Sequence, residues 1–279
     1  MSFWQTTRFQ IDLSSPRVMG IVNVTPDSFS DGGQYGDAAR AIAHCEQLLA
    51  EGADILDIGG ESSRPGAQVL SVEEEWARVA PVLRAALSMG VPVSLDSWKP
   101  EVMARALDLG VDILNDIQAF QSTEAMQLVS AHAGVGLCAM HMRGDSSTMQ
   151  QLTDYVDVVA EVAEFLQFRV KALRDAGVAA ARIVLDPGYG FAKTTPQNFD
   201  LLSRQAELLG LGYPLLVGWS RKRSLGDVTG RSVEQRLPAS VAAAMLAMAR
   251  GAAVLRVHDV AATVDAVKVF QAATQKREG

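Results

Sequence analysis

Cysteine and long apolar runs are scarce in this chain, and both absences narrow its class. The 279 residues include only two cysteines, Cys45 and Cys138, which are too few for a disulfide framework and fit a reducing compartment. No apolar run reaches the roughly 18 residues that span a bilayer, because even residues 241–249 are followed by Arg250. The first residues, MSFWQTTRFQ, lack the apolar core of a signal peptide. These features predict a cytoplasmic protein that does not enter the membrane.

Basic residues are also fewer than acidic ones. Lys and Arg number 25 against 32 Asp and Glu, which gives a formal net charge of −7 and predicts no basic face for nucleic acid or anionic lipid. The sequence has no GxSxG elbow and no Walker loop, so a serine hydrolase or a nucleotide kinase has no support. Neither cysteine forms a zinc-type cluster with His44 or His132. An anionic substrate must therefore be held by a few local cations.

Eight short apolar segments, most of them preceded by glycine, recur along the chain and predict β-strands. Helical segments lie between them, and such alternation is typical of a parallel sheet with right-handed crossovers. Eight units predict closure into a (β/α)8 TIM barrel, as a single domain over residues 1–279. An open doubly wound sheet is the alternative, which the absence of GxGxxG after the first strand disfavours. The segments are residues 18–24 and those that begin at Gly52, Gly90, Gly110, Gly134, Gly177, Pro214 and Gly251.

Several boundaries follow from local signals. The N-terminal residues 1–17 precede the first strand, and we expect them to form a short hairpin that plugs the bottom of the barrel. A helix is predicted over residues 37–50. Ser71 and Glu74 have the spacing of a capping box. Two further helix starts are predicted from Ser232 with Gln235, and from Thr195 as an N-cap before Pro196.

The stretch of residues 18–33, VMGIVNVTPDSFSDGG, predicts a buried strand that ends on the amide Asn23. Pro26 interrupts strand and helix alike, and the Asp-Gly-Gly that ends the stretch is turn chemistry. The loop runs to about Gly36, which is long for a connection between strand and helix. Long loops of this kind are often lids or binding loops, and an ordinary surface loop is the alternative.

Polar residues fall at the predicted strand ends, where barrels of this kind build their active sites. Such a ring of polar groups is hard to explain as core packing. Its members are Asn23, residues 61–64, Asp96, Asn115, Asp116, His141, Asp186, residues 220–222, Arg256 and His258.

Four of these residues suit a planar heterocycle. Asp96 and Asp186 can each pair with an amidine-like edge that offers two parallel N–H donors, and such charge-assisted bonds are strong and directional. Asn115 adds a donor and an acceptor, and Lys222 adds a positive charge. The alternative for Asp96 is an orienting role or a rim salt bridge with Lys222 or Lys99.

A second group is cationic and predicts an anion site. Arg256 and His258 are two residues apart on one strand, so they face the same way and, with Arg64, can hold a diphosphate. Asn23 offers a neutral oxygen ligand for Mg²⁺, which keeps much of its water and shares substrate phosphates. His258 taken alone would be better explained as a buried neutral histidine. His141 is equally consistent with packing and with a supporting role.

Eight motifs together resemble those of the dihydropteroate synthase family, in order and spacing, from about residue 8 to residue 270. The family has a TIM-barrel fold, and the resemblance implies a transferase of folate biosynthesis. That enzyme condenses 6-hydroxymethyl-7,8-dihydropterin diphosphate with p-aminobenzoate and yields 7,8-dihydropteroate and diphosphate. The motifs are MGIVNVTPDSFSDGG, DIGGESSRPGA, SLDSWKPEV, LNDIQ, MHMRG, LDPGYGFAKT, LLVGWSRK and LRVHDV.

The resemblance also assigns roles to matching positions. The pterin-pocket positions are Asp96, Asn115, Asp186 and Lys222, and those near p-aminobenzoate are Ser63, Pro65, Phe191 and Ser220. The catalytic positions of the metal and diphosphate region are Asn23, which would bind Mg²⁺, with Arg64, Arg256 and His258.

The expected mechanism is early loss of diphosphate, which leaves a cation delocalised into the pterin, followed by attack of the arylamine. Mg²⁺ and the cationic side chains stabilise the leaving charge, while the carboxylates favour the positive ring. We expect residues 25–36 and 62–69 to close over the diphosphate and exclude water.

Four positions depart from the usual family pattern. Ser63 stands where threonine is most frequent, Trp98 where a small residue is common, Ala192 where glycine is frequent, and Trp219 where methionine is common. The substitutions near Ser63 keep open the alternative of a non-catalytic pterin-binding paralogue. A pterin-binding methyltransferase, which would share the Asp and Asn pocket, is a second alternative. Both are disfavoured because every leaving-group residue is present.

Residues 238–250, PASVAAAMLAMAR, are apolar nearly all round a predicted helix. That pattern predicts burial beyond one face, either within the barrel's own helix layer or in a dimer contact. The usual dimer of the family favours a homodimer, with small-molecule substrates as the other partners.

Overall fold

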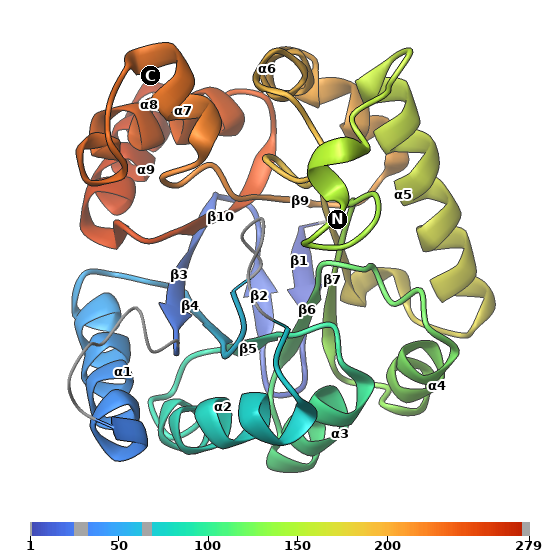
Figure 1. The fold of residues 1–279 in the computed structure, drawn as a ribbon, viewed down its shortest axis with the longest axis vertical. Coiled ribbons are helices and arrows are strands. Elements are labelled where there is room, and N and C mark those ends of the chain that lie inside the picture. The colour runs from blue at the N-terminus through green and yellow to red at the C-terminus, as the bar shows by residue number, and fades with distance from the viewer. Residues whose placement is uncertain (1, 25–32, 63–68, 275–279) are drawn as a thin grey trace, which may run out of the picture.

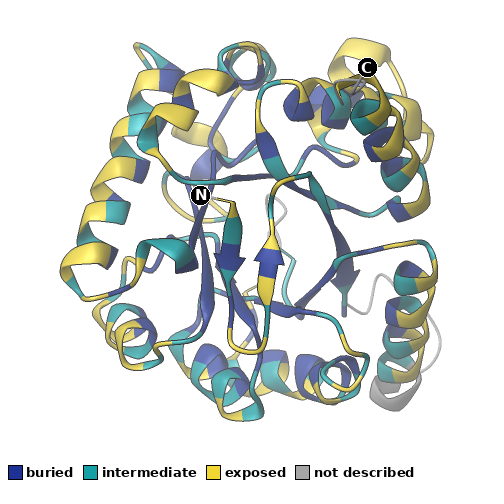
Figure 2. Ribbon diagram, turned by 180° about the vertical axis from the view of Figure 1, so that it is seen from behind, coloured by how far each residue is buried: buried dark blue, intermediate teal, exposed yellow. Residues whose placement is uncertain are grey.

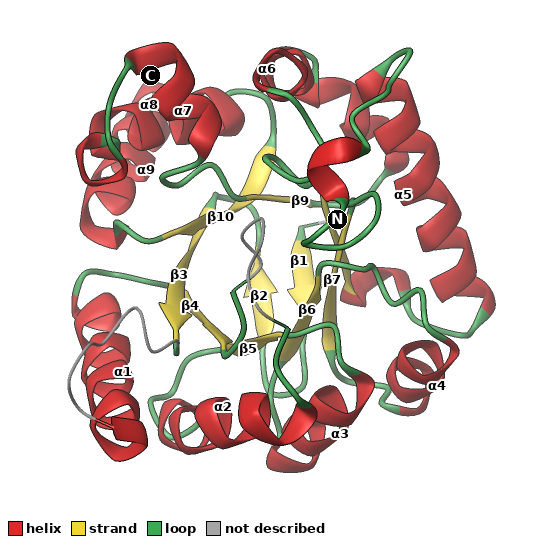
Figure 3. Ribbon diagram, in the orientation of Figure 1, coloured by secondary structure: helices red, strands yellow, loops and turns green. Residues whose placement is uncertain are grey.

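A computed structural model describes residues 2–24, 33–62 and 69–274 of the chain, with only the backbone for residues 33–36. In this part of the chain eight parallel strands close into a barrel in the order β10-β3-β4-β5-β6-β7-β8-β9, with helices around it (Figure 3). The predicted (β/α)8 barrel is therefore confirmed. The strands are β3 (Arg17–Asn23), β4 (Ile55–Gly59), β5 (Val93–Asp96), β6 (Ile113–Asp116), β7 (Gly136–Met140), β8 (Ile183–Asp186), β9 (Leu215–Val217) and β10 (Ala252–Val257).

The barrel strands are buried because helices cover one face and the lumen is filled on the other. In β4, for example, all five residues of ILDIG are buried, as expected for a parallel strand covered on both faces. Side chains alternate between the two faces along a strand. Met19, Ile55 and Val254 therefore point into a lumen cluster, while Val22 and Leu56 join the larger core beneath the helices.

The helices present an exposed outer face and a buried inner face, as Figure 2 shows. Four short 3-10 helices complete the connections that the structure describes, and no helix among the described residues is long and apolar enough to cross a membrane. The α-helices are α1 (Gly33–Ala50), α2 (Val72–Ala86), α3 (Pro100–Leu109), α4 (Thr123–Ala131), α5 (Val158–Asp175), α6 (Thr195–Ser203), α7 (Arg223–Thr229), α8 (Leu237–Met248) and α9 (Val260–Thr274). The 3-10 helices are η2 (Met149–Gln151), η3 (Ala180–Arg182), η4 (Gln205–Leu211) and η5 (Val233–Gln235).

One predicted capping box is confirmed and another is wrong. The Ser71 hydroxyl accepts from the Glu74 backbone N–H at 3.2 Å, and the Ser71 N–H donates to the Glu74 carboxylate at 2.9 Å. Ser232 precedes only η5 and makes no side-chain capping bond there. The next α-helix, α8, begins at Leu237, so η5 is a separate turn and not the start of that helix.

Two other helix starts differ from the prediction. The N-cap of α6 is Thr194 and not Thr195, because Gln197 lies three residues after Thr194 and completes a reciprocal capping box with it. Helix α1 begins at Gly33, four residues before the predicted start at residue 37. The helix therefore takes in the last residues of the predicted loop 25–36.

The N-terminal strands β1 (Phe3–Gln5) and β2 (Gln10–Asp12) form an antiparallel hairpin, as predicted. The hairpin lies within the ring of strands in Figure 1 and in front of it in Figure 2. Trp4 is fully buried in the lumen cluster, and its indole N–H donates to the Arg182 carbonyl at 2.8 Å, just before β8. Arg8 pairs with Asp112, just before β6, at 2.6 Å. The hairpin thus closes the end of the barrel at which the strands begin.

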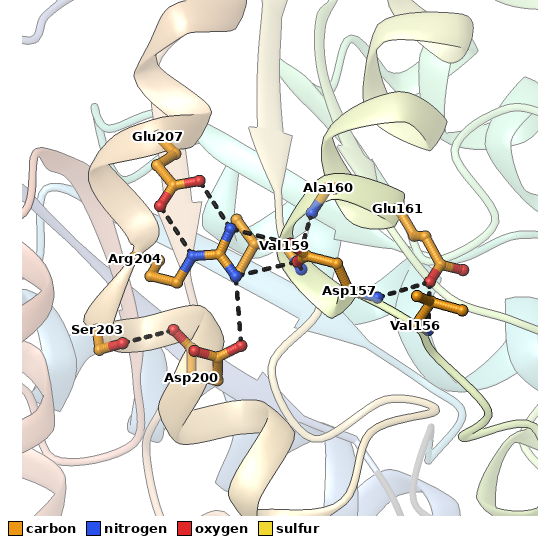
Figure 4. A network of polar contacts seen from close by, with 9 residues as sticks. All are labelled: Val156, Asp157, Val159, Ala160, Glu161, Asp200, Ser203, Arg204 and Glu207. Carbon is orange, nitrogen blue, oxygen red and sulfur yellow. Dashed lines mark hydrogen bonds and ion pairs between the residues drawn. The ribbon is translucent and has the colours of Figure 1, made fainter.

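A polar network joins the start of α5 to α6 and η4 (Figure 4). Arg204 contacts the Asp157 carboxylate at 3.1 Å and the Glu207 carboxylate at 2.8 Å. Asp157 also caps α5 by accepting from the Val159 and Ala160 N–H groups. These groups are partly exposed, so the network orients the helices more than it stabilises the fold.

Helix α8 is apolar on both faces but buried on only one. Ala243, Ala244 and Ala247 are buried against the barrel, whereas Leu237 and Leu246 are 40% and 46% exposed. Helix α8 thus packs in the barrel's own helix layer through one face, and the expected burial beyond one face is not supplied by the rest of the described chain.

The hairpin provides the first test of this fold. Trp4→Ala removes a fully buried indole and its hydrogen bond, so we expect the free energy of unfolding to fall by about 3 to 5 kcal/mol. Urea denaturation measures the loss, and Phe168→Ala, at a side chain that is 65% exposed, is the control. Equal stability of the two variants would contradict the stabilising role of the hairpin at this end of the barrel.

Candidate active site

The polar residues predicted at the strand ends gather at the barrel end opposite the hairpin. Asn23, Asp96 and Asp186 are the last residues of β3, β5 and β8. Asp96 is paired in register with Asn115 of β6, and Arg256 is the fifth residue of β10. The strand ends therefore bring carboxylate, amide and guanidinium groups to one end of one lumen.

Arg256 links the two sides of this end of the barrel. Its Nε donates to Asp57 Oδ2 at 2.6 Å, and its terminal nitrogen donates to Asp96 Oδ2 at 2.5 Å. Asp57, which is fully buried on β4, also accepts from the Asn115 side-chain amide at 3.3 Å. Three strands thus converge on one guanidinium. The long arginine side chain is what allows β10 to reach β4 and β5 beyond β3.

Asp57 is a site residue that the sequence interpretation missed. The signal was present, because a carboxylate in the middle of the apolar segment ILDIG needs a buried partner. Its partner is Arg256, which the sequence placed with the anion-binding group and apart from Asp96. The structure instead brings Arg256 and Asp96 into direct contact. An anion that bound Arg256 would compete with two carboxylates for the same guanidinium.

Burial dominates the protonation of this cluster. Desolvation raises the pKa of Asp96 to about 7, although the Arg256 charge opposes that rise. Burial also raises the pKa of Asp186, against the opposing effects of the Gly188 N–H bond and the Lys222 charge. Burial disfavours the charge of Arg256, but Asp57 and Asp96 outweigh it and raise the pKa of the guanidinium. The cluster therefore favours a ligand that brings hydrogen-bond donors or positive charge.

The loop after β8 forms the second wall of the site. The Asp186 carboxylate accepts from the Gly188 N–H at 2.7 Å, and this bond fixes the position of one carboxylate oxygen. Lys222 Nζ lies 4.2 Å from the centroid of the Phe191 ring, a cation-π contact. A Cβ atom at Gly190 would lie only 3.0 Å from the Lys222 side chain. The loop is thus built closely around Lys222.

His258 and Ser220 make a separate pair at the end of β10. His258 Nδ1 lies 3.0 Å from the Ser220 hydroxyl, which also accepts from the His258 backbone N–H at 3.1 Å. Arg256 is directed to Asp57 and Asp96 instead. The residues that the sequence grouped for one anion therefore have different partners in the structure.

Lys99 does not pair with Asp96, so the alternative of a salt bridge between these two residues is wrong. Its ammonium instead lies 2.6 Å from the Glu61 carboxylate and 2.5 Å from that of Glu75. Glu61 also accepts from the Trp98 indole N–H at 3.0 Å. This cluster therefore joins the residues that follow β4 and β5 to helix α2.

His141 and Lys193 form a buried pair behind the loop after β8. Their nitrogens, His141 Nδ1 and Lys193 Nζ, lie 2.9 Å apart. Burial, and then the Lys193 charge, hold the pKa of His141 well below its usual value. Lys193 was not among the predicted site residues. Its signal was a lysine in the otherwise glycine-rich and apolar run GYGFAK.

Some predicted residues lie outside the described part of the chain. They are Ser63, Arg64 and Pro65, together with residues 25–32 and most of the second predicted closing loop, residues 62–69.

Three comparisons place these observations among known proteins. Residues 19–258 match the family described as pterin binding enzyme. A dihydropteroate synthase from Neisseria meningitidis serogroup B is 52% identical over 275 residues, which cover 96% of both chains.

Solved structures are similar over nearly the whole chain. Xanthomonas albilineans dihydropteroate synthase with 4-aminobenzoic acid has a TM-score of 0.90 and 49% identity, covering 96% of both chains. The same bacterium's enzyme in complex with 7,8-dihydropteroate has a TM-score of 0.87 and 47% identity, covering 96% of this chain and 97% of the other.

The raised pKa of Asp96 makes stability depend on pH. A carboxyl whose pKa rises from 3.8 unfolded to about 7 folded stabilises the fold at low pH, and that contribution is lost as pH rises from about 4 to about 7. Asp96→Asn removes the titration. Between pH 5 and pH 8 the variant should therefore gain more than about 1 kcal/mol over the unliganded parent protein in urea denaturation. A difference that stays constant with pH would refute the assignment.

Proposed function

Because this chain belongs to the pterin binding enzyme family and groups with its dihydropteroate synthases, we propose that it condenses 6-hydroxymethyl-7,8-dihydropterin diphosphate with p-aminobenzoate. The products are 7,8-dihydropteroate and diphosphate, so the protein is a transferase of folate biosynthesis. We further propose that a single barrel domain, residues 1–279, carries the whole activity.

The observation that carries this proposal is the buried set of acidic and amide groups at the strand ends. Burial raises the pKa of Asp96 and of Asp186, so each carboxylate gains from a ligand that donates hydrogen bonds to it. Asn115 is nearly fully buried between them and donates to Asp57. A pterin ring offers an amidine-like edge with several N–H donors, and charge-assisted bonds to carboxylates would hold it strongly. We assign these groups and Lys222 to pterin binding.

The leaving-group side is assigned to Arg64, Arg256 and His258, together with Asn23. Arg256 is already buried against two carboxylates, so its charge is fixed in place before substrate arrives. The described residues contain no group of three or more His, Cys, Asp or Glu suited to a metal. The neutral amide of Asn23 at the end of β3 therefore fits an ion whose other ligands come from water and diphosphate, as Mg²⁺ prefers. Bound Mg²⁺ would supply charge neutralisation of the diphosphate.

We assign the aryl end of the site to Phe191, Ser220, Ser63 and Pro65. The Phe191 ring, in contact with the Lys222 ammonium, offers a flat apolar wall for the benzoate ring. Ser220 lies beside His258 and is buried.

The chemistry required of the protein is mainly electrostatic. We infer that diphosphate leaves early and that the positive charge on the pterin methylene spreads into the ring. Asp96 and Asp186 stabilise that charge, and Arg256, which is held by Asp57 and Asp96, supplies positive charge to the side of the site that we assign to the departing anion. The arylamine nitrogen then forms the new C–N bond and loses a proton. An aromatic amine is nucleophilic without a strong base, so no general base is assigned.

Diphosphate release is the direct test of the proposed reaction. The protein is mixed with pterin diphosphate, p-aminobenzoate and Mg²⁺, and we expect release to require all three. Pterin binding without any release would favour the non-catalytic paralogue. Pterin binding without release in this mixture, but with methyl transfer once a methylated pterin is supplied as the donor, would favour the methyltransferase.

We also propose a homodimer through α8 and a cytoplasmic location. The exposed apolar side chains Ala242 and Leu246, four residues apart on α8, lie on one outer face of the helix, which suits a second copy. Leu246→Asp places a charge in that contact, so sedimentation at micromolar concentration should show a dimer for the parent protein and a monomer for the variant. Monomers in both samples would contradict the proposal.

Substitutions should separate the two sides of the site. Asp96→Ala removes a charge-assisted acceptor, so the affinity for the bare pterin should fall by about 10-fold to 100-fold. Arg256→Ala should slow turnover far more than it weakens pterin binding, because its charge acts on the leaving group. Calorimetry with the bare pterin and a diphosphate-release assay measure both quantities. An Asp96→Ala protein that still binds pterin tightly would overturn the pocket assignment.

A further inference from the structure

Lys193 is a buried lysine to which the proposed mechanism gives no role. It lies in the loop between β8 and α6, and only 3% of its surface is exposed. We propose that Lys193 is a positioning residue, which fixes the turn of residues 188–191 and so places Phe191 for the p-aminobenzoate substrate.

The three N–H bonds of the Lys193 ammonium have three acceptors. Nζ lies 3.0 Å from the Gly188 carbonyl, 3.0 Å from the Phe191 carbonyl and 2.9 Å from His141 Nδ1. Burial lowers the pKa of Lys193 to about 7. In its ammonium form the side chain has three donors and no acceptor, so His141 then presents a bare Nδ1 and carries its proton on Nε2. The low pKa of His141 is consistent with that neutral form. The turn is thereby tied to the end of β7.

The backbone of the turn needs such support because it is tightly packed. Gly188 has a φ of +70°, and a Cβ atom there would lie 1.9 Å from the His141 carbonyl oxygen. Ala192 has a φ of +49°, in the left-handed region that costs a residue with a side chain roughly 1 kcal/mol or more. The bonds to Lys193 span this strained segment and offset its cost.

Asn198 of α6 holds the same turn from its other side. Its side-chain oxygen accepts from the Gly190 N–H at 2.6 Å, and its amide donates to the Lys193 carbonyl at 3.2 Å. With the backbone fixed on both sides, the direction in which the Phe191 side chain leaves the backbone is fixed. The ring contacts Lys222 Nζ on its face.

The pterin pocket depends much less on Lys193. Asp186 is the last residue of β8, while Asp96 and Asn115 are on β5 and β6. Lys193 makes no hydrogen bond to any of the three, and only its charge, which opposes the rise that burial causes in the pKa of Asp186, reaches this pocket. Loss of the ammonium should therefore disturb the aryl end and spare the pterin end. This inference rests on the proposed function, in which Phe191 borders the benzoate ring.

Lys193→Met tests the inference because methionine keeps most of the side-chain length without the donors. We expect the KM for p-aminobenzoate to rise by about tenfold or more, the loss of about one charged hydrogen bond. The Kd for the bare pterin should stay within about twofold. Lys171→Met, which alters a lysine side chain that is 72% exposed on α5, is the matched control and should leave both values unchanged. A Lys193→Met protein with an unchanged KM overturns the inference.

Variants of His141 keep the test decisive if Lys193→Met does not fold. His141→Asn retains an acceptor close to the position of Nδ1, whereas His141→Leu fills similar space without one. We expect a near-normal KM for p-aminobenzoate in the asparagine variant and a raised KM in the leucine variant. Equal KM values in the two folded variants would show a packing role alone and would overturn the inference.

Phe191→Leu separates this inference from the proposed site. If Phe191→Leu raises the KM for p-aminobenzoate and Lys193→Met does not, the aryl site stands and the role of Lys193 is wrong. If neither variant changes the KM, the placement of Phe191 at the aryl end is itself wrong, and the inference falls with it.

Discussion

The contact of Arg256 with Asp57 and Asp96 is the interaction on which the rest of the site depends. A buried carboxylate without a partner is costly, and this end of the lumen holds three carboxylates on neighbouring or facing strands. One guanidinium from β10 joins β4 and β5, at 2.6 Å and 2.5 Å. Because β10 closes the barrel against β3, this last strand must be in place before Arg256 can pair with the buried carboxylates of Asp57 and Asp96. Barrel closure and assembly of the site are therefore coupled.

The two ends of the barrel divide stability from chemistry. At one end the hairpin fills the lumen with Trp4 and binds the starts of β6 and β8. The other end contains features that lower the stability of the fold. They are buried charges, a lysine among backbone carbonyls, and left-handed backbone at Ala192. These costs are characteristic of functional sites, where a preorganised arrangement is more useful than a stable one.

The fold was predictable because its signals are local and repeated. Apolar strands, preceding glycines and the Ser71 capping box can each be recognised from a few neighbouring residues. Asp96, Asn115 and Asp186 were predictable as strand ends. The pairing of Arg256 with Asp57 was not, because it depends on strand order and on an arginine that reaches beyond an adjacent strand. Lys193 was missed for a similar reason, since its partner His141 is 52 residues away.

A double-mutant cycle on Asp57 and Arg256 tests most directly whether Asp57 acts on turnover by holding Arg256. The steady-state kcat/KM for diphosphate release is measured for the parent protein, Asp57→Asn, Arg256→Met and the double variant. The account predicts that Asp57→Asn loses most of its effect once Arg256 is absent, with a coupling above about 1 kcal/mol, as for residues in direct contact. Losses that simply multiply in the double variant would contradict it.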